Sequence, residues 1–259
     1  MKRNYTTVLA AVVTLAASAS AVQAVTLDLN TNDNSGWMVQ RYETDFNDKA
    51  SFNPVLPLMT TLNSTSFNPV AVQAITPSQA GASGAWIEPT SPNWTAKGSS
   101  ALSWVTTPNP DQYNQSEVNG TSYIYMKTFT LGQGSYTLDG QFASDDWLAS
   151  MTLVKFVNGQ WEEVYDFGLD TYSSTGDYYR DPTSLSYTFD ADLNATEYAL
   201  VANVINSYPI SSDDYNNGKP PMPTGFIFGG TVTSNAVPEP ASLSLLGLGA
   251  AALIARRRK

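Results

Sequence analysis

The chain has 259 residues, of which 13 are basic and 23 are acidic, and it contains neither cysteine nor histidine. Without histidine there is no Ser-His-Asp triad and no imidazole base, and zinc or copper sites are not expected, which leaves oxygen-ligated Ca²⁺ or Mg²⁺. Six of the basic residues and one acid lie in the terminal segments, so the middle has a net charge near −15, which repels nucleic acid.

The first 24 residues have the pattern of a secretory signal peptide. A basic start, Met1-Lys2-Arg3, precedes the apolar stretch from Val8 to Ala19. Val22-Gln23-Ala24 then places small residues at the −3 and −1 positions of a cleavage site. We therefore expect cleavage after Ala24 and a mature chain that begins near Val25, the alternative being a buried N-terminal helix.

The next part of the chain gives weak structural signals. Gly36 to Tyr42 predicts a first strand, and residues 50–110 are rich in Pro, Asn, Ser and Thr. Short apolar pieces stand at Val70 to Ile75 and at Ala101 to Val105.

A hairpin is predicted where the strand pattern becomes clear. An alternating series consists of Tyr123, Tyr125, Phe129 and Leu131, with Lys127 interrupting it, and Gly132-Gln133-Gly134 follows as a turn signal. Tyr136 to Phe142 then alternates on the opposite parity. Two amphipathic runs joined by a glycine turn are typical of a β-hairpin.

A second hairpin and two further strands follow. Met151 to Val157 turns at Asn158-Gly159 into the segment Trp161 to Phe167, and Asn-Gly is a strong hairpin signal. Leu185 to Phe189 predicts another strand. Tyr198 to Ile205 is almost continuously apolar, which predicts a central strand.

These segments together predict an all-β fold. Phe226 to Val232 is the last strand signal, and no convincing helix pattern is present outside the two terminal segments. About 213 residues remain between those segments, enough for one sizeable β domain or two small ones. We expect one jelly-roll-like β-sandwich over residues 25–235, flanked by the signal peptide at 1–24 and a sorting and anchor segment at 236–259.

The C-terminal segment combines three signals in order. Val237, Pro238, Glu239 and Pro240 form an extended motif, because two prolines keep it out of a helix. Fifteen small or apolar residues follow, and as a helix they would span roughly 22 Å against about 30 Å of hydrocarbon. The chain then ends on a basic cluster: Arg256, Arg257, Arg258 and Lys259. Such a cluster predicts a cytoplasmic end and an exported body.

On those residues the segment resembles the PEP-CTERM sorting signal. The resemblance implies recognition by an exosortase, an integral-membrane protease-like enzyme of Gram-negative bacteria that make exopolysaccharide. It further implies a transient inner-membrane intermediate that ends at the cell surface or in an extracellular matrix or biofilm. The alternative is an ordinary C-terminal membrane anchor with an accidental Pro-Glu-Pro.

The middle of the chain resembles, more loosely, the jelly-roll domains of galactose-binding-like modules. The likeness runs from Phe129-Thr130-Leu131 through Tyr136-Thr137-Leu138 to residues 140–146, and continues with Asn158-Gly159 and Gly225-Phe226. This resemblance implies sugar or calcium binding through loops at one end of the sandwich. It assigns no ligand residues.

Five acidic residues are candidates for a calcium or glycan site. Asp145 and Asp146 come at the end of a predicted strand, and Asp166, Asp170 and Asp177 lie in or beside a Tyr-rich loop with Tyr172, Tyr178 and Tyr179. Carboxylates suit Ca²⁺ and sugar hydroxyls, and aromatic rings stack on the apolar faces of sugars. Turn hydrogen bonding by the aspartates and a solvated acidic loop are the alternatives.

The sequence therefore predicts an exported surface or matrix protein rather than an enzyme. Glycoside hydrolysis needs two carboxylates at a fixed separation, and no pair stands out among the acidic residues. We expect a structural, adhesive or glycan-binding sandwich with exosortase as partner, exopolysaccharide as a candidate partner, no nucleic acid, and no cofactor apart from calcium as an open alternative. A secreted carbohydrate-binding module or glycan hydrolase is the competing interpretation.

Overall fold

A computed structural model describes most of the predicted sandwich. It covers residues 25–32, 34–43, 58–75, 89–95, 101–106, 121–145, 147–168, 182–206 and 225–235. Within this part of the chain, residues Thr26–Thr233 form one compact unit.

The described strands form two six-stranded sheets, which confirms the predicted β-sandwich. Sheet A has the order β10-β7-β12-β5-β4, with β1 also paired to β12. Its strands are β1 (Thr26–Asp28), β4 (Gln73–Ile75), β5 (Trp104–Thr106), β7 (Ser135–Asp145), β10 (Thr183–Asp190) and β12 (Gly225–Ser234). Sheet B has the order β3-β2-β6-β11-β8-β9. Its strands are β2 (Trp37–Glu43), β3 (Val70–Ala71), β6 (Thr121–Phe129), β8 (Trp147–Val157), β9 (Gln160–Asp166) and β11 (Glu197–Asn206).

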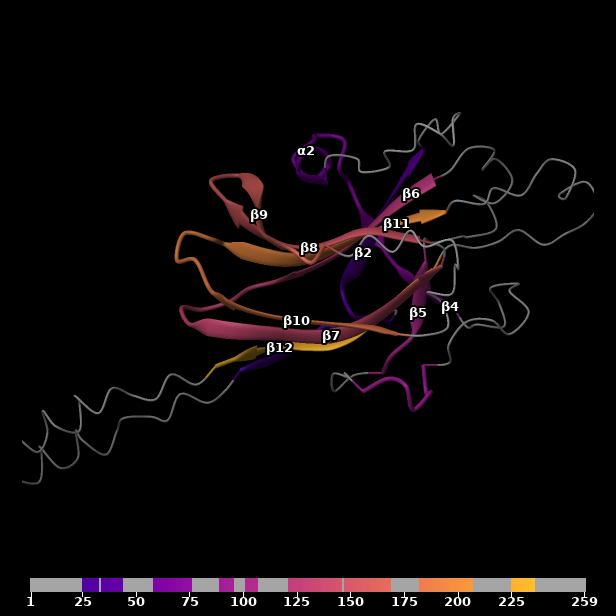
Figure 1. The fold of residues 1–259 in the computed structure, drawn as a ribbon. Coiled ribbons are helices and arrows are strands. Elements are labelled where there is room, and N and C mark those ends of the chain that lie inside the picture. The colour runs from indigo at the N-terminus through magenta and orange to yellow at the C-terminus, as the bar shows by residue number, and fades with distance from the viewer. Residues whose placement is uncertain are drawn as a thin grey trace, which may run out of the picture. The chain divides into compact units, whose positions relative to one another are not determined.

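The two sheets face one another across an aromatic and aliphatic core (Figure 1). Alternate residues point inward because successive side chains of a strand lie on opposite faces. Trp37 and Tyr125 of sheet B and Phe226 of sheet A are buried at its centre. The Phe226 ring lies 5.4 Å from the Trp37 ring and 5.1 Å from the Tyr125 ring, measured between centroids. Burying one such ring contributes about 2 to 3 kcal/mol.

The Phe228 ring fits because two glycines face it. A Cβ on Gly140 of β7 would lie 2.9 Å from Phe228 Cε2, and a Cβ on Gly230 would lie 2.7 Å from the Gly140 Cα. The Gly230 Cβ would also collide with the backbone carbonyl of Asp139. The close approach of β7 and β12 therefore requires glycine at both positions.

Backbone hydrogen bonds join residues 29–31, which follow β1, to β12. Leu29 N donates to Gly230 O (3.0 Å) and Thr31 N donates to Phe228 O (2.9 Å). The Thr31 hydroxyl donates to Ser103 O at 2.6 Å, which brings the segment before β5 to the same place. These bonds extend the β1–β12 pairing beyond the regular strand.

One short helix, α2 (Leu58–Leu62), covers the outer face of sheet B (Figure 1). Leu58 and Leu62 are buried against Ile124 and Val154. The sequence analysis did not predict this helix. Five residues are too few to show a helical period, and tertiary packing of an i, i+4 leucine pair stabilises the turn instead.

The predicted hairpin between β6 and β7 is wrong. β6 pairs with β2 and β11 in sheet B, whereas β7 pairs with β10 in sheet A. The residues around Gly132 and Gly134 thus carry the chain from one sheet to the other. Alternation and a glycine signal cannot distinguish this crossing from a hairpin, because in either case the same alternate residues of each strand face the core.

The predicted hairpin between β8 and β9 is confirmed. The two strands pair antiparallel, and Val157 lies opposite Gln160. Asn158 has φ of 53° and Gly159 has φ of 85°. Positive φ at both turn residues is the pattern of a type I′ turn, which Asn-Gly favours. β11 is also confirmed as a central strand, since it lies between β6 and β8.

The glycine pair yields a test of this packing. We expect Gly230→Ala to lower the free energy of unfolding by about 2 kcal/mol or more, because the new methyl group meets backbone atoms that cannot move aside. Gly132→Ala is the matched control, since its Cβ would lie 3.8 Å from Tyr136 Oη in ordinary contact. Urea unfolding of the purified variants measures both, and equal stabilities would contradict the close approach of β7 and β12.

Candidate functional site

Most of the residues singled out in the sequence lie outside the described ranges. They are Ala24, Asp146, Asp170, Asp177, Val237, Pro238, Glu239, Pro240, Arg256, Arg257, Arg258 and Lys259. Within the described ranges, α2 is the helix of the sandwich, and no helix there has the length and apolar content of a membrane span. The predicted anchor helix at 241–255 is likewise outside those ranges.

The two described aspartates stand at different places. Asp145 is the last residue of β7 and is 6% exposed. Asp166 is the last residue of β9. It lies opposite Thr152, which is five residues after the first residue of β8, Trp147. Its Oδ1 accepts a hydrogen bond from Gly168 N at 2.9 Å, and Gly168 has φ of 62°. This is the turn hydrogen bonding expected of Asp, and no group of three metal-ligating side chains gathers among the described residues.

A stack of aromatic rings closes the side of the sandwich where edge strands β9 and β10 lie. We call Tyr165, Phe167, Tyr187 and Phe189 the edge stack. The rings of Tyr165 and Tyr187 lie 3.8 Å apart at 11°, although one belongs to sheet B and the other to sheet A. Phe167 meets both edge-on, and Phe189 lies parallel to Tyr187.

The Tyr165 ring is the outermost member of the edge stack. The residue is 38% exposed and is the one aromatic among the large hydrophobic residues exposed in the described ranges. A sugar ring can stack on such an aromatic surface through its apolar C–H face. The edge stack therefore combines inner rings that belong to the core with Tyr165 at the surface.

The edge stack continues inward to a polar cluster. Phe189 contacts Tyr198 of β11 at 5.7 Å between ring centroids. The Tyr198 hydroxyl accepts a hydrogen bond from Asp192 N in the turn between β10 and β11. Burial raises the pKa of Tyr198, so the hydroxyl is neutral at physiological pH.

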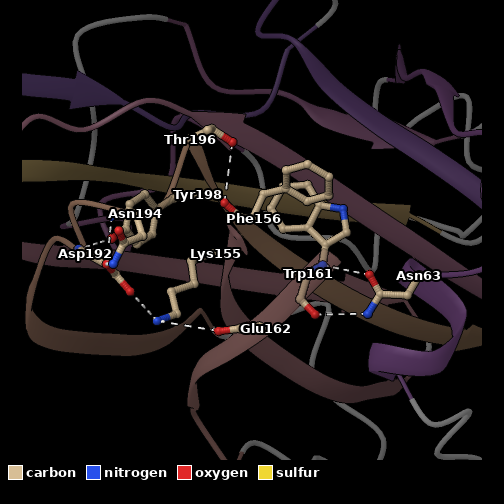
Figure 2. Close-up of polar contacts among 9 residues, drawn as sticks. All are labelled: Asn63, Lys155, Phe156, Trp161, Glu162, Asp192, Asn194, Thr196 and Tyr198. Carbon is tan, nitrogen blue, oxygen red and sulfur yellow. Dashed lines mark hydrogen bonds and ion pairs between the residues drawn. The ribbon is translucent and has the colours of Figure 1, made fainter. Parts of the chain in front are cut away.

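Lys155 joins three separate parts of the fold in this cluster. Its Nζ donates to Asp192 Oδ2 at 2.6 Å and lies 3.6 Å from Glu162 Oε2 of β9, as Figure 2 shows. The hydrogen bond lowers the pKa of Asp192 and raises the pKa of Lys155. A carboxylate with a lowered pKa is suited to an ion pair rather than to general acid catalysis.

The turn that carries Asp192 is held by its own hydrogen bonds. Asp192 Oδ1 accepts from the Asn194 backbone N at 2.9 Å and from Asn194 Nδ2 at 3.2 Å. Ala195 N donates to Asp192 O at 3.1 Å, and Thr196 N donates to Phe156 O at 3.0 Å. Asp192 thus both shapes the turn and fixes it to β8.

The edge strand β9 is also covered on its outer side. Trp161 N donates to Asn63 Oδ1 at 2.7 Å, and Asn63 Nδ2 donates to Trp161 O at 3.0 Å (Figure 2). The Asn63 amide therefore replaces a neighbouring strand at this position. Blocking an edge in this way reduces pairing with other chains.

The sequence analysis missed Lys155, Asp192 and Asn63 as structural partners. The Asp192-Leu193-Asn194 run is a turn signal that could have been recognised. Lys155 lies 37 residues from Asp192, and Asn63 lies 98 residues from Trp161. Sequence spacing carries no information on pairs so far apart.

Comparison with known proteins identifies the C-terminal segment. Residues 236–259 match the PEP-CTERM protein-sorting motif, which confirms the resemblance of that segment and implies export across the inner membrane and processing by exosortase. No curated protein matches the sequence.

Solved structures resemble the chain only distantly. The enzymatically active domain of bacteriophage CBA120 tailspike protein 4 is 10% identical with a TM-score of 0.34, over 77% of this chain and 19% of that chain. The chain thus spans about a fifth of that solved chain. CBM4 is 12% identical with a TM-score of 0.30, over 57% and 83%. TmCBM61, solved with β-1,4-galactotriose, is 6% identical with a TM-score of 0.27, over 83% and 90%. Scores of this size do not establish a shared topology, so the sandwich assignment rests on the sheets described above.

The Lys155–Asp192 pair predicts a pH-dependent stability. Because the folded pKa of Asp192 is lowered, its contribution is present above the unfolded pKa of about 4 and is lost as pH falls through the folded value. Because the pKa of Lys155 is raised, its contribution is lost only as pH rises through that higher value. We expect Lys155→Gln to be less stable than wild type at pH 7 and equally stable at the acid limit.

Urea midpoints measured from pH 3 to pH 9 test this expectation. Asp190→Asn, at an exposed position two residues before Asp192, is the control and should change the midpoint little at any pH. A Lys155→Gln deficit that is the same at pH 3 and pH 7 would show that the ion pair is not its cause.

Proposed function

We propose that the chain, which carries a PEP-CTERM sorting motif at residues 236–259, is an exported protein processed by exosortase. In this proposal the sandwich is delivered to the cell surface or extracellular matrix, where it has a structural, adhesive or glycan-binding role in an exopolysaccharide layer. The sandwich itself is not an enzyme. The sorting motif is the single observation that carries the proposal.

The order of signals in the tail supports a transient anchor. The motif precedes the apolar run, and the basic cluster Arg256 to Lys259 ends the chain. Cationic residues favour the cytoplasmic side, which leaves Val237 to Pro240 on the outer side within reach of a membrane enzyme. The signal peptide at residues 1–24 would begin the same export.

The composition of the sandwich supports a partner that is not strongly anionic. With 7 basic and 22 acidic residues between the terminal segments, long-range repulsion disfavours nucleic acids and polyanionic glycans. Neutral polysaccharides, or acidic ones bridged by Ca²⁺, fit this charge better. The exposed ring of Tyr165 in the edge stack provides a surface on which a neutral sugar can stack.

Processing is tested by changing the motif. We expect the triple variant Pro238→Ala, Glu239→Ala and Pro240→Ala, expressed in a host that has exosortase, to accumulate as an uncleaved membrane species. Changing Pro220, Pro221 and Pro223 to Ala is the matched control, because it removes three prolines outside the motif and should leave processing unchanged. Immunoblotting of membrane and medium fractions gives the readout, and normal processing of the motif variant would refute the assignment.

Glycan binding is tested separately at the edge stack. We expect the exported protein to be retained on a column of exopolysaccharide, and Tyr165→Ala to weaken binding about tenfold through loss of one stacking surface. Tyr165→Phe keeps the ring and should bind like wild type, and thermal melts check that both variants are folded. Equal retention of all three proteins would place binding elsewhere, whereas release of sugars from the column would favour the hydrolase alternative.

A further inference from the structure

The turn between β10 and β11 contains an extended acceptor sequence for N-linked glycans. Asp192-Leu193-Asn194-Ala195-Thr196 includes Asn-x-Thr, the acceptor pattern for N-glycosylation in exported proteins. It also has a carboxylate, Asp192, two positions before the asparagine, where a cationic group of a transferase can bind it through a charge-assisted hydrogen bond. We propose that Asn194 is an N-glycosylation site that receives an oligosaccharide from a lipid-linked donor. This inference rests on the export in the proposed function, because the transfer takes place outside the cytoplasm.

The position of the turn makes the acceptor accessible. Leu193 is 73% exposed, and both Asn194 and Thr196 are exposed. The turn joins the edge strand of sheet A to sheet B, at the rim of the sandwich rather than on a packed face. A transferase can therefore approach Asn194 without unfolding either sheet.

The Asn194 amide can be modified without breaking its turn. One Nδ2 hydrogen points to Asp192 Oδ1 at 3.2 Å, and an amide nitrogen carries two hydrogens. In the transfer, Nδ2 loses the other proton to the enzyme's base and forms a bond to the anomeric carbon of the donor. The bond from that carbon to the pyrophosphate oxygen breaks, and the lipid pyrophosphate leaves with the electron pair. The glycosylated amide retains one hydrogen for Asp192.

The two recognition groups lie at the surface, where they can exchange hydrogen-bond partners. The Thr196 hydroxyl donates to Phe156 O at 3.4 Å, which is a long hydrogen bond. The Asp192 carboxylate pairs with Lys155 at the surface, where its side chain is 29% exposed. Ion pairs in such positions are weak, so a cation of the transferase can replace Lys155.

Two other Asn-x-Thr sequences in the described ranges lack these features. In Asn63-Ser64-Thr65 the amide already binds both backbone groups of Trp161, and residue 61 is threonine. In Asn93-Trp94-Thr95 the middle residue is 3% exposed, and residue 91 is serine. We expect neither to be modified, and both serve as internal controls.

A third Asn-x-Thr sequence, at Asn119, has to be measured separately from Asn194. Glu117-Val118-Asn119-Gly120-Thr121 also has an acidic residue two positions before the asparagine, but its asparagine lies outside the described ranges. Peptide mass spectrometry resolves Asn119 from Asn194, so modification at one does not obscure the other.

The experiment uses the full chain in the periplasm of a Gram-negative host that expresses a bacterial oligosaccharyltransferase and a lipid-linked oligosaccharide. We expect a glycan mass on the peptide containing Asn194, its complete loss in Asn194→Gln, and at least a tenfold lower occupancy in Asp192→Asn. Asp192→Glu and Thr196→Ser keep the recognition groups and should remain modified. Lys155→Gln removes the same ion pair as Asp192→Asn but leaves the acceptor sequence intact, so it should also remain modified.

Each failure has a distinct meaning. Fractionation first establishes that the chain has left the cytoplasm, and a chain retained inside contradicts the proposed export. The occupancy is then measured on a chain whose residues 1–24 are replaced by the signal peptide of an exported host protein. An exported chain without glycan on Asn194, beside a modified reference acceptor protein in the same cells, overturns the site. Loss of occupancy in Lys155→Gln equal to that in Asp192→Asn overturns direct recognition of the Asp192 carboxylate.

Discussion

The sandwich depends on the packing of the Phe228 ring against two glycines, which have no side chains in its way. Gly140 and Gly230 allow β7 and β12 to approach closely, and the ring fills the space that their missing side chains leave. Phe228 also contacts Trp37 of the opposite sheet, 5.9 Å between ring centroids. The same strand, β12, holds residues 29–31 through backbone hydrogen bonds. One strand of sheet A thus positions residues 29–31 and a large part of the aromatic core.

The side formed by β8, β9 and β10 combines rigidity with exposure. Tyr165 and Tyr187 join the two sheets by ring stacking, and Lys155 joins β8 and β9 to the turn at Asp192. These contacts fix the backbone while Leu193, Asn194 and one surface of Tyr165 remain in solvent. A rigid, exposed rim is a suitable place for contacts with carbohydrate, whether a glycan binds there or is attached there.

The outcomes for the two predicted hairpins show which local signals are reliable. Asn158-Gly159 needs no distant partner, because both residues adopt positive φ and set the register of β8 and β9 themselves. The glycines at 132 and 134 join strands with the same alternating pattern, yet β6 and β7 enter different sheets. Whether the two strands form a hairpin or enter different sheets depends on their other partners. β6 pairs with β11 and β7 pairs with β10, and each pairing joins residues dozens of positions apart.

The amino-acid order alone determined the sorting signal, the acidic exported character and the all-β class. Each of these depends on contiguous residues or on period-two alternation, which a linear chain displays directly. Only the tertiary structure decided that Asp192 pairs with Lys155 and that Asn63 covers Trp161. Such pairs form because two sheets and a helix bring distant residues within a few ångströms, and no local pattern records which residues will meet.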